Sequence, residues 1–452
     1  QQGVGRGNGL TDTEIDAIAS QVNTYWTDIF FRKGTTTTHD LGITTGTKNT
    51  SNYTSLGYLE QDGIFLNTDL KRFSVRNNFS GKSDNERFDY STNLSVNFSR
   101  TNELSGAGSD ALYFAPFNAA LTSLPYVSPY DPDGSITKDG GFGPGDPRAF
   151  AQELVPIVLL NSVSMNTDRD EELTLLGSFM ANYKVTDNIT AGVQLGADYS
   201  TEKLLDIIHP ESILGPFQVA GLNGEQEFGG WQLERYRREF RFNSVFSLNY
   251  TNTFADKHTV DVTAYTEYIK GHLDRLGFNQ FGLDARIIGT GSAFIDGNTF
   301  ESINGADPIQ PYIPDVIANK VSEGLFSYFG VLNYDFDNKY GLSASIRRDN
   351  SFRFVGDNKW GTFWSVAGRW NIDEEAFMDN SIFNTLKLRV SHGVSGNQRI
   401  NNAEFSALNE TRNLYASGTG YNGAPSTGAS QLANVDLRWE QLTQSNIGID
   451  FG

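Results

Sequence analysis

Apolar and polar residues alternate at every second position over most of the chain, a pattern that predicts β-strands. The pattern is clearest between residues 339 and 398. The first strand of that stretch has on one face Tyr340, Leu342, Ala344 and Ile346. The second strand has on one face Trp360, Trp364, Val366, Trp370 and Ile372. Tryptophans near both ends of an apolar face are typical of strands that cross a bilayer, because indole rings favour the headgroup level.

The connections between the predicted strands differ in length. Short turns are predicted at Asp187, Asp256 and Asp337. Long irregular segments are predicted over residues 100–172, 204–236, 271–323 and 397–437. Outer-membrane barrels have short periplasmic turns and long extracellular loops, whereas a soluble β-sandwich, which also alternates, gives no reason for this asymmetry. The pattern therefore favours a transmembrane antiparallel barrel, with a soluble sheet as the alternative.

We expect the chain to divide into a lead-in segment and a barrel portion. Residues 1–38 include one helix-like stretch, with Thr11 or Thr13 as its cap and apolar residues at helical spacing. Those apolar residues are Ile15, Ile18 and Val22. Residues 39–452 carry the strand pattern, with about thirteen strands. A bacterial single-chain barrel has an even number of strands and no free edge, so closure needs further strands unless the count is wrong.

Composition narrows the classes that remain. The chain has 35 basic and 54 acidic residues and a net charge of −19, which argues against nucleic acid, whose phosphates require clustered cations. Cysteine is absent from the sequence, which excludes disulfides and thiolate metal sites. No segment approaches the roughly 18 consecutive apolar residues of a membrane helix. A membrane-spanning version must therefore be a barrel, because only a closed sheet satisfies every backbone group in lipid.

Five segments of the sequence carry a resemblance to a known family. They are residues 25–64, 130–135, 340–378, 386–400 and 437–452. Among them, residues 130–135 read YDPDGS and residues 386–400 read LKLRVSHGVSGNQRI. In this order the segments resemble the barrel of SusC/RagA-type TonB-dependent transporters, and the resemblance extends over nearly the whole chain.

The resemblance implies a fold, a location and partners. The implied fold is all-β, a transmembrane antiparallel barrel of roughly 22 strands around a plugged lumen, with long extracellular loops. The implied location is the bacterial outer membrane, where the barrel is in contact with lipid. The implied partners are the TonB complex, which acts through the plug region, and a SusD-like lipoprotein that lids the extracellular mouth, in dimers of barrel–lid pairs in some members. The plug and the last strands have no match here, so we expect a portion of a longer chain.

The function expected from the resemblance is TonB-dependent uptake of oligosaccharides together with a SusD-like lipoprotein. Three alternatives stay open: a peptide importer of the RagA type, a siderophore or cobalamin receptor, and a soluble or surface glycan-binding β protein. An enzyme is not expected, because the five His residues are scattered and no nucleophile and base fall in a catalytic motif.

Aromatic residues of the long loops are the candidate substrate contacts, since sugar rings and apolar side chains both pack on flat aromatic faces. These residues are Tyr113, Phe114, Tyr126, Tyr130 and Trp231. For each of them the alternative role is packing within its loop or contact with the lid protein.

Two acidic segments receive structural interpretations. Residues 131–139 loosely resemble a calcium loop, but Phe142 occupies the position where such a loop carries a bidentate Glu, so we expect a plain turn and no cofactor. Residues 373–375 are three consecutive acids in a short connection between strands. We expect them to form a solvated periplasmic turn rather than a pair of catalytic acids.

Overall fold

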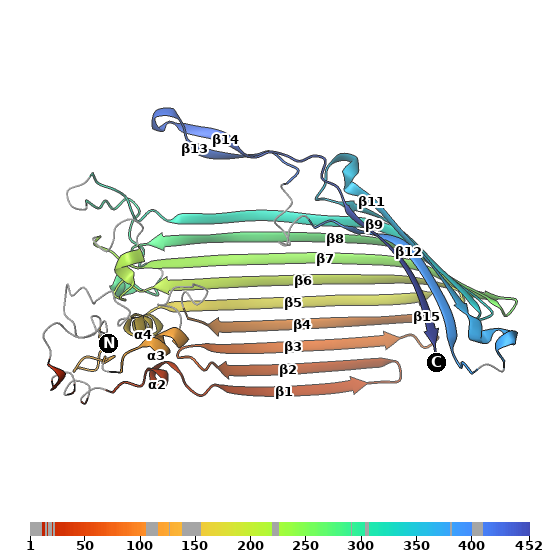
Figure 1. The fold of residues 1–452 in the computed structure, drawn as a ribbon, viewed down its shortest axis with the longest axis horizontal. Coiled ribbons are helices and arrows are strands. Elements are labelled where there is room, and N and C mark those ends of the chain that lie inside the picture. The colour runs from red at the N-terminus through yellow and green to blue at the C-terminus, as the bar shows by residue number, and fades with distance from the viewer. Residues whose placement is uncertain are drawn as a thin grey trace.

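Thirteen antiparallel strands form one sheet in strict chain order, from β1 to β12 and then β15 (Figure 1). The computed structural model describes residues 11–13, 16, 20, 23–104, 116–125, 127–137, 155–218, 226–290, 292–302, 307–379, 382–399 and 410–452. The first eight strands are β1 Thr35–Gly46, β2 Thr50–Asp62, β3 Asp69–Lys82, β4 Phe88–Asn102, β5 Thr167–Lys184, β6 Ile189–Ile208, β7 Trp231–Phe254 and β8 His258–Phe281. The others in the sheet are β9 Asp315–Phe336, β10 Tyr340–Ser351, β11 Trp360–Asn371, β12 Leu386–Asn397 and β15 Glu440–Phe451.

The register between strands gives the sheet one apolar and one polar face. On the outward face, Val262 is opposite Leu332, which is opposite Ala344, which is opposite Val366. Large apolar side chains on this face stay exposed to the surroundings, as Leu248, Ile346 and Ile447 do at 54%, 59% and 77%. Such a wide uncovered apolar surface is expected where lipid, not protein, is the neighbour.

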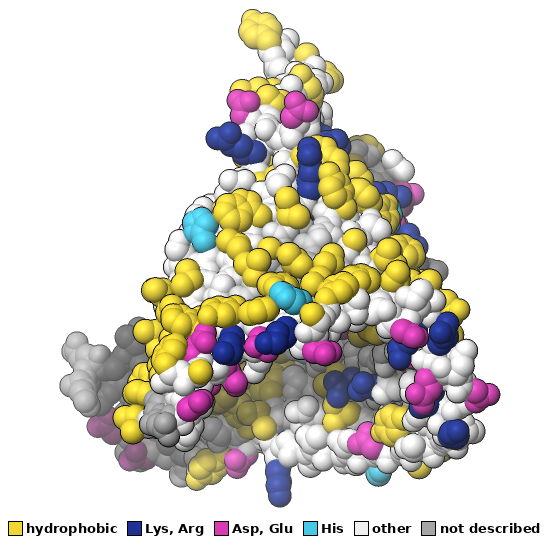
Figure 2. Space-filling view, turned by 90° about the vertical axis from the view of Figure 1, so that its right-hand side faces the viewer, with side chains coloured by type: hydrophobic (Ala, Val, Ile, Leu, Met, Phe, Trp, Pro, Cys, Tyr) yellow, Lys and Arg dark blue, Asp and Glu magenta, His cyan; other side chains and the backbone are white. Residues whose placement is uncertain are grey.

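The short connections gather at one end of the sheet (Figure 1). In two of them, two consecutive residues have positive φ: Ala255 with Asp256, and Asp337 with Asn338. Two left-handed residues in succession match the twist of tight antiparallel hairpins. Figure 2 looks onto this end and shows acidic and basic side chains along the rim, with hydrophobic side chains spread over the wall above it. The predicted asymmetry between short turns and long loops is therefore confirmed.

Several strands run much further than the alternation predicts. β7 and β8 each have 24 residues, whereas crossing a bilayer takes about 9–11 tilted residues. The sequence places irregular segments from Leu204 and Gly271, but β6 continues to Ile208 and β8 to Phe281. Those boundaries were wrong because a strand that projects beyond the bilayer has polar surroundings on both faces, so its alternation fades.

Short helices cover the long-loop end of the first strands. They are α2 Trp26–Phe30, α3 Pro116–Thr122 and α4 Val155–Met165. Trp26 and Phe30 are buried in one cluster with residues of α4 such as Ile157 and Leu159. The described parts of the segment between β4 and β5 thus fold and pack. Among the described residues, no helix is both long and apolar enough to cross a membrane.

The described residues of the expected N-terminal helix, Asp12, Thr13, Asp16 and Ser20, are helical, and its apolar residues Ile15, Ile18 and Val22 lie outside the described residues. Two features at the ends of the chain were not predicted. The first is α2, because five residues are too few to show helical periodicity. The segment predicted as the loop 397–437 contains a hairpin, β13 Leu414–Thr419 with β14 Pro425–Gln431. It forms a separate sheet and projects past the rim of the wall (Figure 1). Its small and polar residues gave no alternation to detect.

Candidate functional site: the polar inner wall

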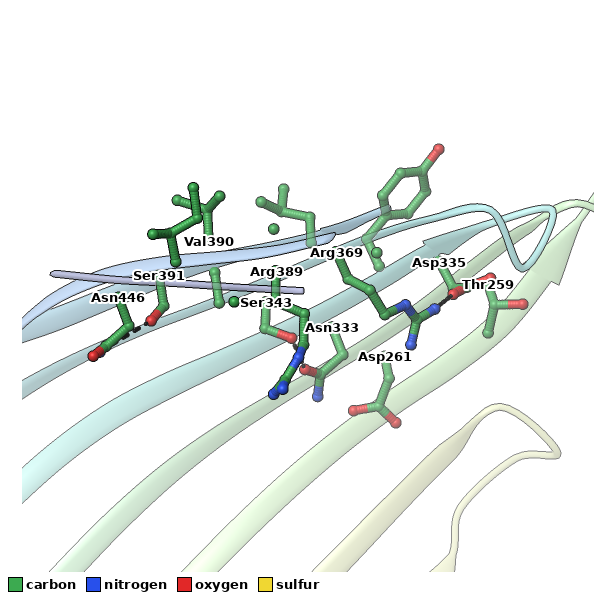
Figure 3. A pocket seen from close by; sticks show the side chains of 17 residues that line it. Thr259, Asp261, Asn333, Asp335, Ser343, Arg369, Arg389, Val390, Ser391 and Asn446 are labelled. Atoms are coloured by element: carbon green, nitrogen blue, oxygen red, sulfur yellow. Dashed lines mark hydrogen bonds and ion pairs between the residues drawn. The ribbon is translucent and has the colours of Figure 1, made fainter. Parts of the chain in front are cut away.

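The inward face of β8 to β12 and β15 lines a groove near the short-turn end, with a volume of about 740 Å³. Its side chains are amides, hydroxyls and charged groups, and Figure 3 shows them projecting to one side while Val390 points to the other. They include Asp261, Asn333, Asp335, Ser343, Arg369, Arg389, Ser391 and Asn446. This separation follows from the two-residue period of a strand, which sends successive side chains to opposite faces.

Most charges in this groove are already paired across strands. Arg369 on β11 donates to Asp335 on β9, and Arg389 on β12 donates to Asp450 on β15 at 2.7 Å. The amide of Asn249 donates to Asp261 at 3.1 Å. The groove offers fixed hydrogen-bond donors and acceptors and is suited to holding a hydrated polar partner by non-covalent contacts.

A tighter cluster centres on Arg347 in the middle of β10. Its guanidinium donates to Asp349 at 2.6 Å, to Ser327 at 2.8 Å and to Glu267. The same guanidinium lies 4.6 Å from the centre of the Phe329 ring. Asp349 and Ser327 are buried, so this part of the inner wall is rigid. The alternation predicts that Arg347 faces inward, but its partners on β8 and β9 depend on a register that the sequence alone does not provide.

A second ion cluster lies toward the long-loop end of the wall. Glu323 on β9 accepts from Arg241 at 3.4 Å and from the buried Arg353 at 2.9 Å. Ser351 donates to Gln398 at 2.6 Å and so connects the end of β10 to the segment after β12. These contacts connect β7, β9, the end of β10 with the residues that follow it, and the segment after β12.

A buried tyrosine, Tyr312, connects the loop before β7 with the loop between β8 and β9. Tyr312 is fully buried, and its hydroxyl donates to Glu301 at 2.5 Å and accepts from the backbone of Phe228 at 3.2 Å. Burial, together with the bond to Glu301, raises the pKa of Tyr312 well above its ordinary value. Gly282 has φ +74, and a Cβ there would lie 2.3 Å from the Tyr312 ring. The sequence did not single out Tyr312, because nothing local distinguishes it from the other loop aromatics.

The five aromatic residues predicted as substrate contacts are only partly visible. Tyr113, Phe114 and Tyr126 lie outside the described residues. Tyr130 is 48% exposed and pairs with Ile136 in an isolated bridge. Trp231 opens β7 opposite Ile208 and Phe281, and its buried indole N–H has no hydrogen-bond partner among the described residues. Tyr130 and Trp231 therefore sit on separate elements of the long-loop end.

The acidic segment at 131–139 forms a turn in its described part. Gly134 has φ +85 and donates its N–H to Asp131 at 2.9 Å. The carboxylate of Asp133 accepts from the hydroxyl and the N–H of Ser135, and these bonds lower the pKa of Asp133. Asp139 and Phe142 lie outside the described residues. Within the described ranges, no three His, Asp or Glu side chains are grouped as metal ligands.

The acids at 373–375 close the turn between β11 and β12. The carboxylate of Glu375 accepts from the Tyr340 hydroxyl, from Lys339 at 3.1 Å and from the Trp370 indole at 3.2 Å. The bond from Tyr340, followed by that from Lys339, lowers the pKa of Glu375. This carboxylate anchors two aromatic rings at the end of the sheet, which is a structural role.

The sequence of this chain is similar to those of known receptors. No protein-family model matches the chain. The TonB-dependent receptor SusC of Bacteroides thetaiotaomicron is 26% identical over 460 residues, covering 98% of this chain and 42% of SusC. The TonB-dependent receptor P26 of Formosa agariphila is 25% identical over 435 residues, covering 95% of this chain and 39% of that receptor. The chain resembles SusC-type TonB-dependent receptors over nearly its full length.

The solved structures agree on the fold. The RagAB peptide transporter superimposes with a TM-score of 0.73 at 22% identity, covering 99% of this chain and 48% of that chain. The sheet of this chain is a partial barrel, open at β1 and β15 in the described residues, and its expected location in the bacterial outer membrane is confirmed. The chain spans less than half the length of the relatives it matches.

Proposed function

We propose that this chain is part of the barrel wall of an outer-membrane TonB-dependent importer that takes up oligosaccharides with a SusD-like lipoprotein. The observation that carries the proposal is the match to SusC along 98% of the chain, combined with a wall that is apolar outside and polar inside. Short turns at one end and long loops at the other give the wall the orientation of an outer-membrane barrel. The relatives are named as receptors, and import without covalent chemistry needs no catalytic group.

The polar inner wall carries groups that a plug domain inside the barrel would contact. Its groove presents paired charges and amides on strands that cannot slide, because each pair is fixed by cross-strand register. A plug domain would rest on these groups and move when TonB pulls on it. Coupling to TonB is proposed from the relatives, which are named TonB-dependent.

The long-loop end supports the proposed lid and substrate contact. The strands project beyond the bilayer there, and Tyr312, Glu323 and the α2–α4 cluster stabilise the rim on which a SusD-like lipoprotein would sit. Trp231 at the start of β7 and the exposed Tyr130 remain the proposed contacts for sugar rings. Oligosaccharide is favoured by the resemblance to SusC, one of the relatives matched in sequence; a peptide, as the RagAB transporter carries, or a siderophore is an outcome of the test.

The test is purification of the full-length parent protein from outer membranes in detergent, followed by mass spectrometry of what accompanies it. A lipoprotein in roughly equal amount, and uptake of a glycan that requires both proteins, would support the proposal. Uptake of peptides instead would assign the RagA type of substrate. Purification without any lipoprotein, with growth dependent on an iron chelate, would overturn the proposal in favour of a siderophore receptor.

Substitution of the proposed contact residues sharpens the test. Trp231→Ala is expected to weaken glycan binding by about three- to tenfold, the usual worth of a lost aromatic stacking contact. Tyr421→Ala is the control, because Tyr421 is 98% exposed at the tip of the β13–β14 hairpin. Equal affinities for the two variants would remove Trp231 from the substrate site.

A further inference from the structure

Unpaired basic side chains gather on the outward face of β8 and β9 at the long-loop end. Lys270 on β8 and Lys320 on β9 share the parity of the outward apolar residues Tyr268 and Phe326. Lys359 and Arg412 approach from the neighbouring connections. Together with Phe352 these cations line a groove of about 370 Å³, which we call the basic groove.

The basic groove is positive although the whole chain is acidic. Its lining contains four cations and no carboxylate, in a chain whose net charge is −19. Other cations at this end of the wall are neutralised, as Lys203 is by Glu234 at 2.8 Å and Arg100 by Glu171 at 3.9 Å. In the described part of the chain, no ion pair joins any of the four groove cations to a carboxylate; Asp274, opposite Lys320 in the register, is paired with Arg238 instead.

The groove is arranged to receive an anion. The ammonium of Lys270 lies 4.7 Å from the centre of the Phe352 ring, which holds the cation in place and leaves its N–H donors available. A second groove of about 400 Å³ adjoins it through Lys320, Val321 and Ser322. That groove adds His272 and Arg238, the latter paired with Asp274 at 2.7 Å. Its floor is apolar, with Tyr199 and Phe240.

The position of the groove along the membrane normal indicates which kind of anion it receives. Just below it, on the outward face, aromatic rings form a belt: Tyr328 lies 6.1 Å from Trp360, and Arg348 lies 5.0 Å from the same indole. Aromatic belts mark the level of the lipid headgroups. Lys270 and Lys320, which lie immediately above this belt on the outward face, meet the phosphates of lipids in the outer leaflet and not an imported substrate.

We propose that the basic groove binds a phosphate-bearing lipid head group of the outer leaflet. The phosphate lies between Lys270 and Lys320, within reach of Lys359 and Arg412, and the acyl chains descend along the apolar band of β7 to β9. The nearest carboxylate in the register, Asp274 opposite Lys320, is paired with Arg238 at 2.7 Å, and the lipid phosphate supplies a negative charge for the groove cations. The inference depends on the orientation of the wall in the membrane and not on the imported substrate.

The experiment uses the full-length parent protein in detergent and native mass spectrometry after mixing with vesicles. One set of vesicles is phosphatidylcholine alone and the other contains monophosphoryl lipid A. The double variant Lys270→Gln/Lys320→Gln is expected to lose retention of the phosphorylated lipid by about fivefold for each lysine removed. The matched control, Lys48→Gln/Lys257→Gln, removes the same charge from two short turns at the opposite end of the wall and should retain the lipid as the parent does.

Further arms separate the competing explanations. Lys270→Arg/Lys320→Arg should restore retention, which also shows that the site and not the fold was lost in the glutamine variant. If inorganic phosphate at equal concentration displaces the lipid, the groove is a site for free phosphate and not for a lipid head group. Equal retention in the glutamine variant and the control, or occupation of the groove by an acidic polypeptide, would overturn the proposal. None of these readouts involves the lid or transport, so their failure leaves the import proposal untouched.

Discussion

Arg347 joins three strands of the wall through one side chain. It donates to groups on β8, β9 and β10, and its neighbour Phe329 stacks on Tyr265 with ring centres 4.5 Å apart. The side chain of Asp349 is 8% exposed, so water replaces a lost guanidinium poorly. A buried acceptor that loses its donor keeps its desolvation penalty.

Arg347→Gln is therefore expected to lower the free energy of unfolding of the full-length parent by about 1.5–3 kcal/mol. Arg389→Gln is the control, since the Arg389–Asp450 pair is 59% and 43% exposed, and such pairs contribute about 0–1 kcal/mol. The measurement is urea unfolding from liposomes, followed by tryptophan fluorescence. An equal loss of unfolding free energy in the two variants would show that burial of the Arg347 cluster does not add to stability.

At the scale of elements, the turn after β11 is expected to respond to pH through Glu375. The folded pKa of Glu375 lies below its ordinary value of 4.5. The stability that the ionised carboxylate gives to this turn is therefore present above pH 4.5, and it is lost as the pH falls through the folded pKa. The hydrogen-exchange protection of residues 372–379, measured relative to the intrinsic exchange rate at each pH, should therefore fall on acidification. In Glu375→Gln the protection should already be low at neutral pH and change less with pH; an identical pH profile of protection in both proteins would refute the assignment.

The sequence predicted elements better than it predicted their ends. Thirteen strands, their inward and outward faces and the short turns followed from alternation, because lipid on one side imposes a period of two. The 24-residue lengths of β7 and β8 did not, because projecting segments lack that one-sided contact. The cluster around Arg347 could not be predicted either, since it joins residues 80 positions apart, Glu267 and Arg347. Of the proposed loop contacts, Tyr130 and Trp231 lie among the described residues and stay predictions.

For the whole molecule, the division into an outer and an inner surface gives a direct test. Val366 faces outward in the middle of the apolar band, and the next residue, Ala367, lines the inner groove. Val366→Lys is expected to destabilise the full-length parent in a bilayer by about 2–4 kcal/mol, the penalty of a lysine near the midplane. Ala367→Lys adds the same charge on the wet side and should have a small effect. The reverse order, measured by urea unfolding from liposomes, would mean that the faces are assigned the wrong way round.

The length of β7 and β8 also determines which parts of the proposed importer can move. Backbone pairing between them continues without interruption from Phe254 and His258 to Trp231 and Phe281. At about 3.3 Å per residue, 24 residues extend to roughly 80 Å along the strand, well past a hydrocarbon core of about 30 Å even when tilted. A sharp hinge within such a ladder would break backbone bonds, so the paired strands form a stiff frame. In the importer proposed above, opening and closing of the mouth would then take place at a hinge in the proposed lid or in the loops, while the wall beneath it stays still.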